Sequence, residues 1–343
     1  MFGYNYKNSR SYFIKQPNLF NLATSELSQD AFLSWLLMWA NKDYKLSNDK
    51  LHKCAVEFVQ NLLQKDIDFK INTIEVGKQK NHIDVWAKIN DEYFILIEDK
   101  KATKEHSNQL NRYAKFMKNE LTEEKLVLVY FKMEEQGNYD KVQEAGYEIF
   151  SRNQMLSIIS KYKGVNSILD DYIDYLEELD EKINSFKKLP LNDWHWYSWK
   201  GFYNKLQNEL KGNWDYVSNP SGGFLGYWWH WKYITINNNN FELYLQLEQD
   251  KLIVKIKNPN KETRKDIREI VRKNLFQLES ENNISFSKYG RVGMWMGIAK
   301  LNEEYRKTDV TGLINLEKTF QYLKNIEQLI DNLIKKLDKE YNL

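Results

Sequence analysis

The spacing of apolar residues changes abruptly from a helical period to a strand period, and no other feature of the sequence constrains the fold as much. The new period predicts a strand at about residues 69–76, a second at residues 83–89 in which polar and apolar residues alternate, and a third at residues 93–97 that is apolar throughout. Asn90-Asp91-Glu92 is expected to form the hairpin turn between the last two strands. Because an unbroken apolar strand is typical of a strand covered on both faces, we expect a sheet flanked by helices.

Helical patterns precede and follow these strands. The first helix is expected to begin with Thr24 or Ser25 as its N-cap. The other predicted elements of this part are helices at about residues 49–65, 105–119 and 155–186 and strands at residues 126–131 and 147–150. This order predicts an α/β fold, a mixed sheet flanked by helices, for a first domain at residues 1–189. Leu189-Pro190 marks the boundary, since proline disfavours helix in the residue before it.

The composition shifts after this boundary. Seven of the 11 tryptophans lie between Trp194 and Trp231. Strands are predicted at about residues 226–236, 241–247, 252–256 and 294–301, and helices at about residues 199–210, 261–278 and 311–339. Residues 190–343 are therefore expected to form a Trp-rich α+β domain that ends in a long helix and recognises nucleic acid, senses a signal or binds a partner.

Two features of this second domain allow both a structural and a functional interpretation. The tryptophans are expected mainly to pack a β core, and the alternative is that they stack on unpaired bases. The basic residues between Lys261 and Lys273 share much of one helical surface, which suits either contact with a phosphate backbone or a solvated face.

Length and composition exclude a disulfide-stapled miniprotein, a disordered chain and a membrane protein. The chain of 343 residues, 42% hydrophobic and 29% charged, is long enough for about two globular domains. Its 50 Lys and Arg residues against 48 Asp and Glu residues give a net charge of +2, so any basic surface for nucleic acid must be local.

The single cysteine and the N-terminal sequence bear on the compartment. Cys54 alone forms neither an intramolecular disulfide nor a cysteine-based zinc site, which favours the reducing cytoplasm. Residues 1–20 lack the pattern of a secretion signal, and no stretch approaches about 18 apolar residues. We therefore expect a cytoplasmic protein with no membrane partner.

Acidic and basic side chains come together at one end of the predicted hairpin. Asp84 lies in a strand whose other face is apolar, and Glu98 and Lys100, two residues apart, point to the same side of the next strand. Hard divalent cations prefer a few carboxylates together with water and phosphate oxygens, so Asp84 and Glu98 are candidate metal ligands, with the backbone carbonyl of Asp99 as a third. Lys100 would orient or deprotonate the attacking water, and such a site supports hydrolysis of a phosphodiester.

This arrangement resembles the PD-(D/E)XK nuclease superfamily, in which an acidic residue on one strand is followed by Glu-x-Lys on the adjacent strand. Asp84 and Glu98-Asp99-Lys100 match this motif, although His82-Ile83-Asp84 stands in place of the family's Pro-Asp. Glu26 opens a segment of the form Glu-x-x-x-x-x-Phe-Leu-x-Trp-Leu-Leu, where bacterial members carry a helical active-site glutamate. Gln109, followed by Tyr113, resembles the glutamine-and-tyrosine helix found after the lysine strand in many members. The resemblance covers about residues 20–160.

The resemblance implies a Mg²⁺-dependent endonuclease that hydrolyses phosphodiester bonds, with Mn²⁺ as a substitute ion and a role in bacterial defence. DNA is favoured over RNA as the substrate, and the sequence leaves the choice between them open. A homodimer or a partner protein from a defence system is also expected. The apolar side of the terminal helix at residues 311–339 suits either docking within the chain or pairing with another copy. The implied catalytic residues are Asp84, Glu98, Lys100, Glu26 and Gln109, and the implied metal ligands are Asp84, Glu98, Asp99 and Glu26.

Each of these residues also has a purely structural interpretation. Glu98 to Lys101 suits a solvated strand end, and Glu26 suits a carboxylate that stabilises a helix dipole. Gln109 suits an exposed amide, Tyr113 a packing residue, and His82 either a contact to substrate phosphate or a satisfied polar group. At the level of the whole protein, the alternative function is a noncatalytic nucleic-acid-binding or regulatory protein that retains the nuclease fold.

Overall fold

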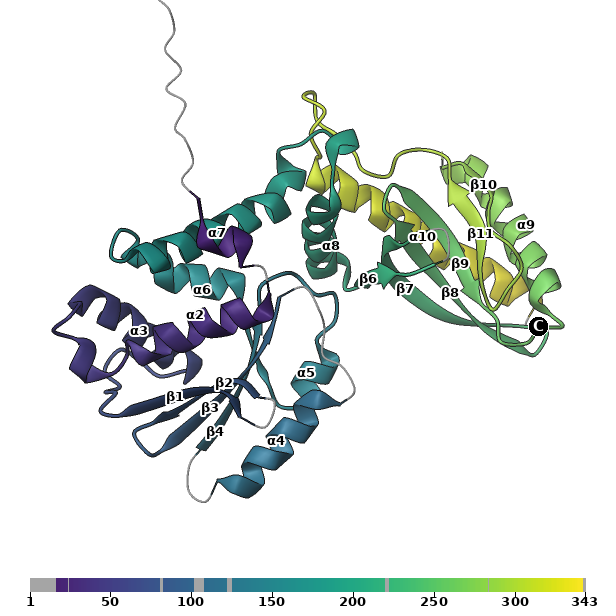
Figure 1. The fold of residues 1–343 in the computed structure, drawn as a ribbon. Helices are drawn as coiled ribbons and strands as arrows, with labels where there is room; N and C mark the ends of the chain where they lie inside the picture. The colour runs from purple at the N-terminus through teal and green to yellow at the C-terminus, as the bar shows by residue number, and fades with distance from the viewer. Residues whose placement is uncertain are drawn as a thin grey trace, which may run out of the picture. The chain divides into compact units, whose positions relative to one another are not determined.

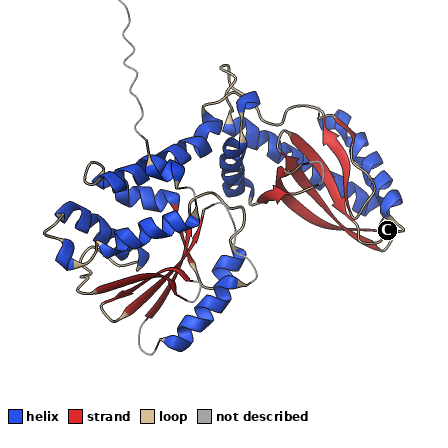
Figure 2. Ribbon diagram, viewed as in Figure 1, coloured by secondary structure: helices blue, strands red, loops and turns tan. Residues whose placement is uncertain are grey.

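The computed structural model describes residues 17–23, 25–80, 83–101, 108–121, 125–219, 222–282 and 284–341. The chain forms two compact units, the first from residues 1–133 and 145–178 and the second from residues 134–144 and 179–343. Each unit has its own sheet, as Figure 2 shows. The functional division into a nuclease-like domain and a recognition domain stays a prediction.

A five-stranded mixed sheet forms the centre of the first unit, with strand order β1-β2-β3-β4-β5. Strands β1 to β3 are antiparallel, whereas β4 and β5 run parallel to β3. The strands are β1 (Ile74–Lys80), β2 (Ile83–Ile89), β3 (Tyr93–Lys100), β4 (Lys125–Lys132) and β5 (Glu148–Ser151). Every residue of β3 is buried, as expected for a strand covered on both faces.

Helices cover this sheet. Helix α2 packs against β1, β2 and β3, and α4 lies on the other side of the sheet, next to β4 (Figure 1). The helices that begin in the first unit are α1 (Leu19–Leu22), α2 (Glu26–Met38), α3 (Asp49–Leu62), α4 (Gln109–Glu120), α6 (Arg152–Ile159) and α7 (Ser167–Asn184). Short 3-10 helices are η1 (Lys42–Tyr44), η2 (Ser160–Tyr162), η3 (Ser185–Lys187) and η4 (Leu191–Asp193). The predicted α/β class, a mixed sheet flanked by helices, is confirmed.

A six-stranded sheet forms the second unit, with strand order β10-β11-β9-β8-β7-β6 and every pairing antiparallel. The strands are β6 (Asn213–Val217), β7 (Phe224–Ile236), β8 (Asn239–Glu248), β9 (Lys251–Lys257), β10 (Phe286–Lys288) and β11 (Trp295–Leu301). The helices are α5 (Asp140–Glu144), α8 (Trp196–Leu210), α9 (Arg264–Asn282) and α10 (Leu316–Tyr341). Helices α8, α9 and α10 share one hydrophobic core with one face of the sheet, which confirms the predicted α+β arrangement.

Local sequence explains where the elements differ from the prediction. The segment predicted as one helix over residues 155–186 is two, α6 and α7, because the chain turns at Gly164 with a φ of +86° that glycine adopts without strain. The first strand begins at Ile74 rather than near residue 69. The predicted hairpin turn is confirmed, with φ of 55° at Asn90 and 54° at Asp91.

Most of the clustered tryptophans pack the core of the second unit, as expected. Trp194, Trp199, Trp214 and Trp229 are at most 8% exposed, whereas Trp231 is 38% exposed. Two arginines of the basic helix, Arg268 and Arg272, are buried and donate hydrogen bonds to backbone carbonyls of the segment 289–298. These two side chains therefore serve the packing of α9 against β11.

Within the described ranges, no helix has the length and apolarity that crossing a bilayer requires. Cys54 is fully buried in α3, and burial raises the pKa of its thiol to about 12. It is therefore a core residue, as expected.

Candidate active site

The β2–β3 hairpin places Asp84, Glu98 and Lys100 on one face of the first sheet. Val85 pairs with Ile97 in the antiparallel register, so Asp84 and Glu98 are neighbours across the two strands. Residues of β2 alternate between buried and half-buried positions, and Asp84 belongs to the half-buried set. The structure therefore brings together three of the residues that the sequence singled out.

Lys100 lies between the two carboxylates. Its Nζ is 2.6 Å from Glu98 Oε1 and 3.8 Å from Asp84 Oδ2, and it donates a hydrogen bond to the backbone carbonyl of Asp99 at 3.0 Å. The Glu98 side chain is fully buried, whereas that of Asp84 is 25% exposed. The group opens to solvent on the Asp84 side, where a substrate can approach.

Burial and mutual repulsion set the charge of this group. Burial and the nearby Asp84 carboxylate raise the pKa of Glu98 to about 7, although Lys100 opposes the shift. Burial also raises the pKa of Asp84, against the effect of Lys100 and of the Asp99 backbone N–H, which donates to Asp84 Oδ2 at 2.9 Å. Burial lowers the pKa of Lys100, but Glu98, Asp84 and Glu26 outweigh burial, so the net shift is upward. Lys100 is the cation that stabilises the two carboxylates.

Asp99 lies between Glu98 and Lys100 in sequence, so its side chain points to the opposite face of β3, toward α2. It is fully buried and accepts a hydrogen bond from the Gln29 side chain. Asp30, also on α2, is 2% exposed. Burial and the Asp84 carboxylate raise the pKa of Asp30 to about 7, and a hydrogen bond with Asp99 opposes this.

Gln29 and Asp30 were not among the site residues predicted from the sequence. A signal was present, because Asp30 lies one helical turn after Glu26, one turn before Leu33 and two turns before Leu37, on the apolar stripe of α2. A carboxylate on an apolar stripe requires a buried partner. That partner, Asp99, lies 69 positions further along the chain and is known only from the fold.

Glu26 is the first residue of α2. Ser25 is the N-cap residue, and its side chain makes no capping hydrogen bond. Glu26 Oε1 accepts a hydrogen bond from the backbone N–H of Lys101, one residue beyond β3, at 3.2 Å. Glu26 therefore lies at the same end of β3 as Glu98 and Lys100. The other predicted cap, Thr24, and the phosphate contact suggested for His82 lie outside the described residues.

Gln109 and Tyr113 lie one turn apart on α4, and the Gln109 amide donates a hydrogen bond to the Tyr113 hydroxyl at 3.0 Å. Burial raises the pKa of Tyr113, and the Glu98 and Asp84 carboxylates raise it further. Burial and the nearby Glu98 and Asp84 carboxylates also raise the pKa of Tyr147. The Tyr147 hydroxyl donates a hydrogen bond to the Leu110 carbonyl. Tyr113 and Tyr147 therefore lie within electrostatic reach of the carboxylates. Tyr147 was not among the residues predicted from the sequence.

The oxygen atoms of this site suit a hard cation. Glu98 Oε2 is buried, and no described residue donates a hydrogen bond to it, so the carboxylate has an oxygen available for a ligand. Mg²⁺ needs only one or two protein carboxylates, with water and substrate phosphate completing its shell. Asp84 and Glu98 meet that requirement.

Over the described ranges, no three His, Cys, Asp or Glu side chains form a ready metal-binding group. The Asp99 carboxylate lies on the other face of β3, where it meets Gln29. The backbone carbonyl of Asp99 instead lies beside Lys100.

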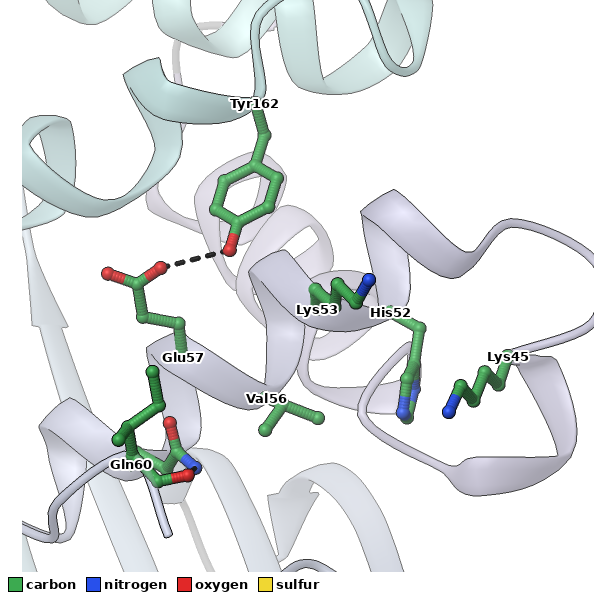
Figure 3. A pocket seen from close by; sticks show the side chains of 8 residues that line it. Lys45, His52, Lys53, Val56, Glu57, Gln60 and Tyr162 are labelled. Carbon is green, nitrogen blue, oxygen red and sulfur yellow. Dashed lines mark hydrogen bonds between the residues drawn. The ribbon is translucent and has the colours of Figure 1, made fainter.

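A cavity of about 350 Å³ lies elsewhere in the first unit (Figure 3). It is bordered by α3, by Ile67 and by Tyr162, whose hydroxyl donates a hydrogen bond to Glu57 at 3.0 Å. Lys45, His52 and Lys53 line its other part. None of the candidate active-site residues lines this cavity.

Comparison with known proteins bears on the first unit. No curated protein and no solved structure matches the chain. The sequence profile of one family matches residues 17–193, which is just over half of the chain and includes all the candidate site residues. This match agrees with the fold and with the positions of Asp84, Glu98 and Lys100. The chain belongs to the PD-(D/E)XK nuclease superfamily.

Proposed function

We propose that this protein is a metal-dependent endonuclease that hydrolyses phosphodiester bonds in DNA. The observation that carries the proposal is the position of Lys100 Nζ between the carboxylates of Asp84 and Glu98 at one end of the β2–β3 hairpin. A pair of carboxylates, one buried and one half-buried, with a single ammonium between them is costly to build for stability alone. Such a group suits a site that binds a cation and a phosphate.

Asp84 and Glu98 are the residues that would hold Mg²⁺, and Mn²⁺ would substitute for it, since both ions accept carboxylate and water oxygens. The bound ion would polarise the scissile phosphate and lower the pKa of a coordinated water molecule. Lys100 keeps its positive charge beside Glu98, so it would donate a hydrogen bond to the attacking water or to a phosphate oxygen. The Asp99 N–H, which donates to Asp84 Oδ2, fixes the direction of that carboxylate.

Glu26, Asp99 and Gln109 complete the proposed site. The Glu26 carboxylate lies beside the Lys101 backbone at the end of β3 and would bind a coordinated water or the ion. The Asp99 backbone carbonyl is proposed as a further ligand. The Gln109 amide, held by Tyr113, would contact the substrate backbone.

The test is cleavage of supercoiled plasmid and of labelled single-stranded DNA and RNA with Mg²⁺, with Mn²⁺ and with EDTA. We expect cleavage of DNA only with a divalent ion. Asp84→Asn should abolish this cleavage, and Lys100→Ala should lower its rate by about 100-fold or more. Asp91→Asn is the matched control, because Asp91 lies in the same hairpin with a side chain that is 79% exposed.

Two results would contradict the proposal. Cleavage that persists undiminished in Asp84→Asn would place the activity elsewhere or in a contaminant. DNA binding without cleavage under every metal condition would favour the alternative, a noncatalytic nucleic-acid-binding or regulatory protein with the nuclease fold. The defence role, the cytoplasmic location and a homodimer or partner protein belong to the same proposal and rest on the family resemblance and the single cysteine.

A further inference from the structure

The sheet of the second unit has two chemically different faces. Leu243, Leu245 and Leu247 of β8 point into the core formed with α8, α9 and α10. Since side chains alternate along a strand, the residues between them point the other way. We call this other side the outer face and define it by Trp231, Tyr233, Tyr244, Lys255, Lys257 and Trp295.

A β-bulge turns Trp231 onto the outer face. Trp229 pairs with Leu245 and Lys232 pairs with Leu243, so two residues of β7 lie opposite the single residue Tyr244. The extra residue, His230, has a φ of 55°. A bulge with a non-glycine residue at positive φ costs free energy, and such bulges re-aim a side chain. Here the bulge lets Trp229 remain in the core while Trp231 points outward.

Three rings of the outer face form one cluster. Trp231 stacks on Tyr244 with ring centroids 4.0 Å apart and planes at 6°. Trp295 meets both rings edge-on, with centroids 6.1 Å from each. Trp231 remains 38% exposed and Trp295 49% exposed. Tyr233, on the same face of β7, is 84% exposed. Exposed rings in fixed orientations provide surfaces on which planar groups can stack.

Lysines lie among these rings. The register places Lys257 opposite Trp295, and its Nζ lies 4.8 Å from the centre of that ring. Lys257 also pairs with Glu242 at 2.6 Å, which neutralises one of the acidic groups on this face. Lys255 lies opposite Tyr244, and its pKa is lowered by burial, an effect that Glu248 opposes. Burial disfavours the charged form of Lys255, so an anionic ligand beside it would stabilise that form.

We propose that the outer face binds a single-stranded segment of nucleic acid, with unpaired bases on Trp231 and Trp295 and phosphates beside Lys255 and Lys257. Aromatic platforms interleaved with cations bind single strands with little sequence preference, because every base has a π-face. The proposal deepens the proposed function, since it supplies a nucleic-acid contact outside the catalytic group. It rests on that function only for its biological purpose, because binding requires neither a metal ion nor cleavage.

The test is binding of the full chain, in EDTA, to fluorescein-labelled oligothymidylate and oligouridylate of about 16 nucleotides, followed by fluorescence anisotropy. Trp231→Ala and Trp295→Ala should each weaken binding by about 5- to 150-fold. Lys257→Gln should weaken binding and reduce its dependence on salt. Trp196→Ala is the matched control, because Trp196 is 40% exposed on α8, away from this sheet face. Circular dichroism shows whether each variant is folded, and Tyr233→Ala, at the most exposed ring, provides a variant without a packing defect.

Several outcomes would overturn the inference. One is that the wild type binds neither oligonucleotide, and a second is that the Trp231 and Trp295 variants bind as tightly as the wild type. The third such outcome is a Trp196→Ala control that loses as much affinity as the Trp231 and Trp295 variants. A further contrary result is a Trp295→Ala variant that changes the oligomeric state in sedimentation without changing affinity, since the face would then bind another copy of the chain. All these measurements are made without a divalent ion, so they stand apart from any failure of cleavage.

Discussion

Asp30→Asn is the substitution for which the structure makes the sharpest quantitative prediction. Asp30 is 2% exposed, and its ionised form lies beside the carboxylates of Asp99 and Asp84. Asparagine preserves the shape of the side chain, carries no charge and can donate a hydrogen bond to Asp99. We therefore expect the variant to be more stable than the wild type at neutral and alkaline pH.

The magnitude follows from the shift of the Asp30 pKa from 3.8 to about 7 on folding. Between these two values the folded state binds a proton that the unfolded state has lost, so this carboxyl lowers stability progressively as the pH rises and reaches its full cost above about pH 7. At 1.36 kcal/mol per unit, the advantage of Asp30→Asn is about 2 kcal/mol near pH 5 and about 4 kcal/mol near pH 8. The increase with pH is the part that depends on charge rather than on packing.

The assay is urea unfolding of the wild type and the variant in EDTA at both pH values, followed by tryptophan fluorescence. The difference between the two proteins reports Asp30 together with its electrostatic coupling to Asp99 and Asp84, since the Asp30 charge also raises the pKa of Asp99. Asp91→Asn, at a side chain that is 79% exposed, is the control variant. A stability difference that is equal at the two pH values, or a variant less stable than the wild type near pH 8, would refute the reasoning.

Three further predictions concern other parts of the chain. Gly201→Ala should destabilise the second unit by about 2 kcal/mol or more, measured by thermal unfolding, because a Cβ there would lie 2.0 Å from the Ile183 carbonyl oxygen. Glu134→Ala should cost about 3 to 5 kcal/mol in the same assay and Glu134→Gln less, since Glu134 forms a buried ion pair with Lys200 at 2.5 Å. The Cys54 thiol should not react with a thiol reagent in the native protein, because the thiol is buried and its pKa is raised to about 12. It should react once urea unfolds the protein. Rapid reaction in the native protein would contradict the burial of Cys54.

Local patterns carried most of the fold prediction. The hairpin of β2 and β3 follows from alternation in one strand, an unbroken apolar run in the next and two turn residues, Asn90 and Asp91, that tolerate positive φ. Among the short strands, β5 was predicted but β6 and β10 were not, because three to five residues carry too little periodicity to distinguish an edge strand from a loop consistently.

The candidate site was predictable only where it depends on the geometry of one strand or one hairpin. Glu98 and Lys100 share a face because side chains alternate along a strand, and the hairpin brings Asp84 to the same face. The same alternation sends the Asp99 carboxylate to the opposite face, where it meets Gln29 from a helix far away in the sequence. That contact depends on how α2 packs on the sheet, which the pattern of residues in either element does not specify.

The path of the chain limits how the protein can be cut into pieces. Residues 134–144 leave the first unit, pack as part of the second, and return before β5. Within the second unit, Glu134 pairs with Lys200, and the Gly137 carbonyl accepts a hydrogen bond from Gln207. A truncation at residues 189 and 190 would therefore separate this excursion from its partners and leave Lys200 buried without its carboxylate. A fragment meant to preserve the second unit has to retain the chain from residue 134 onward, and deleting residues 134–144 from the first unit requires a linker between residues 133 and 145.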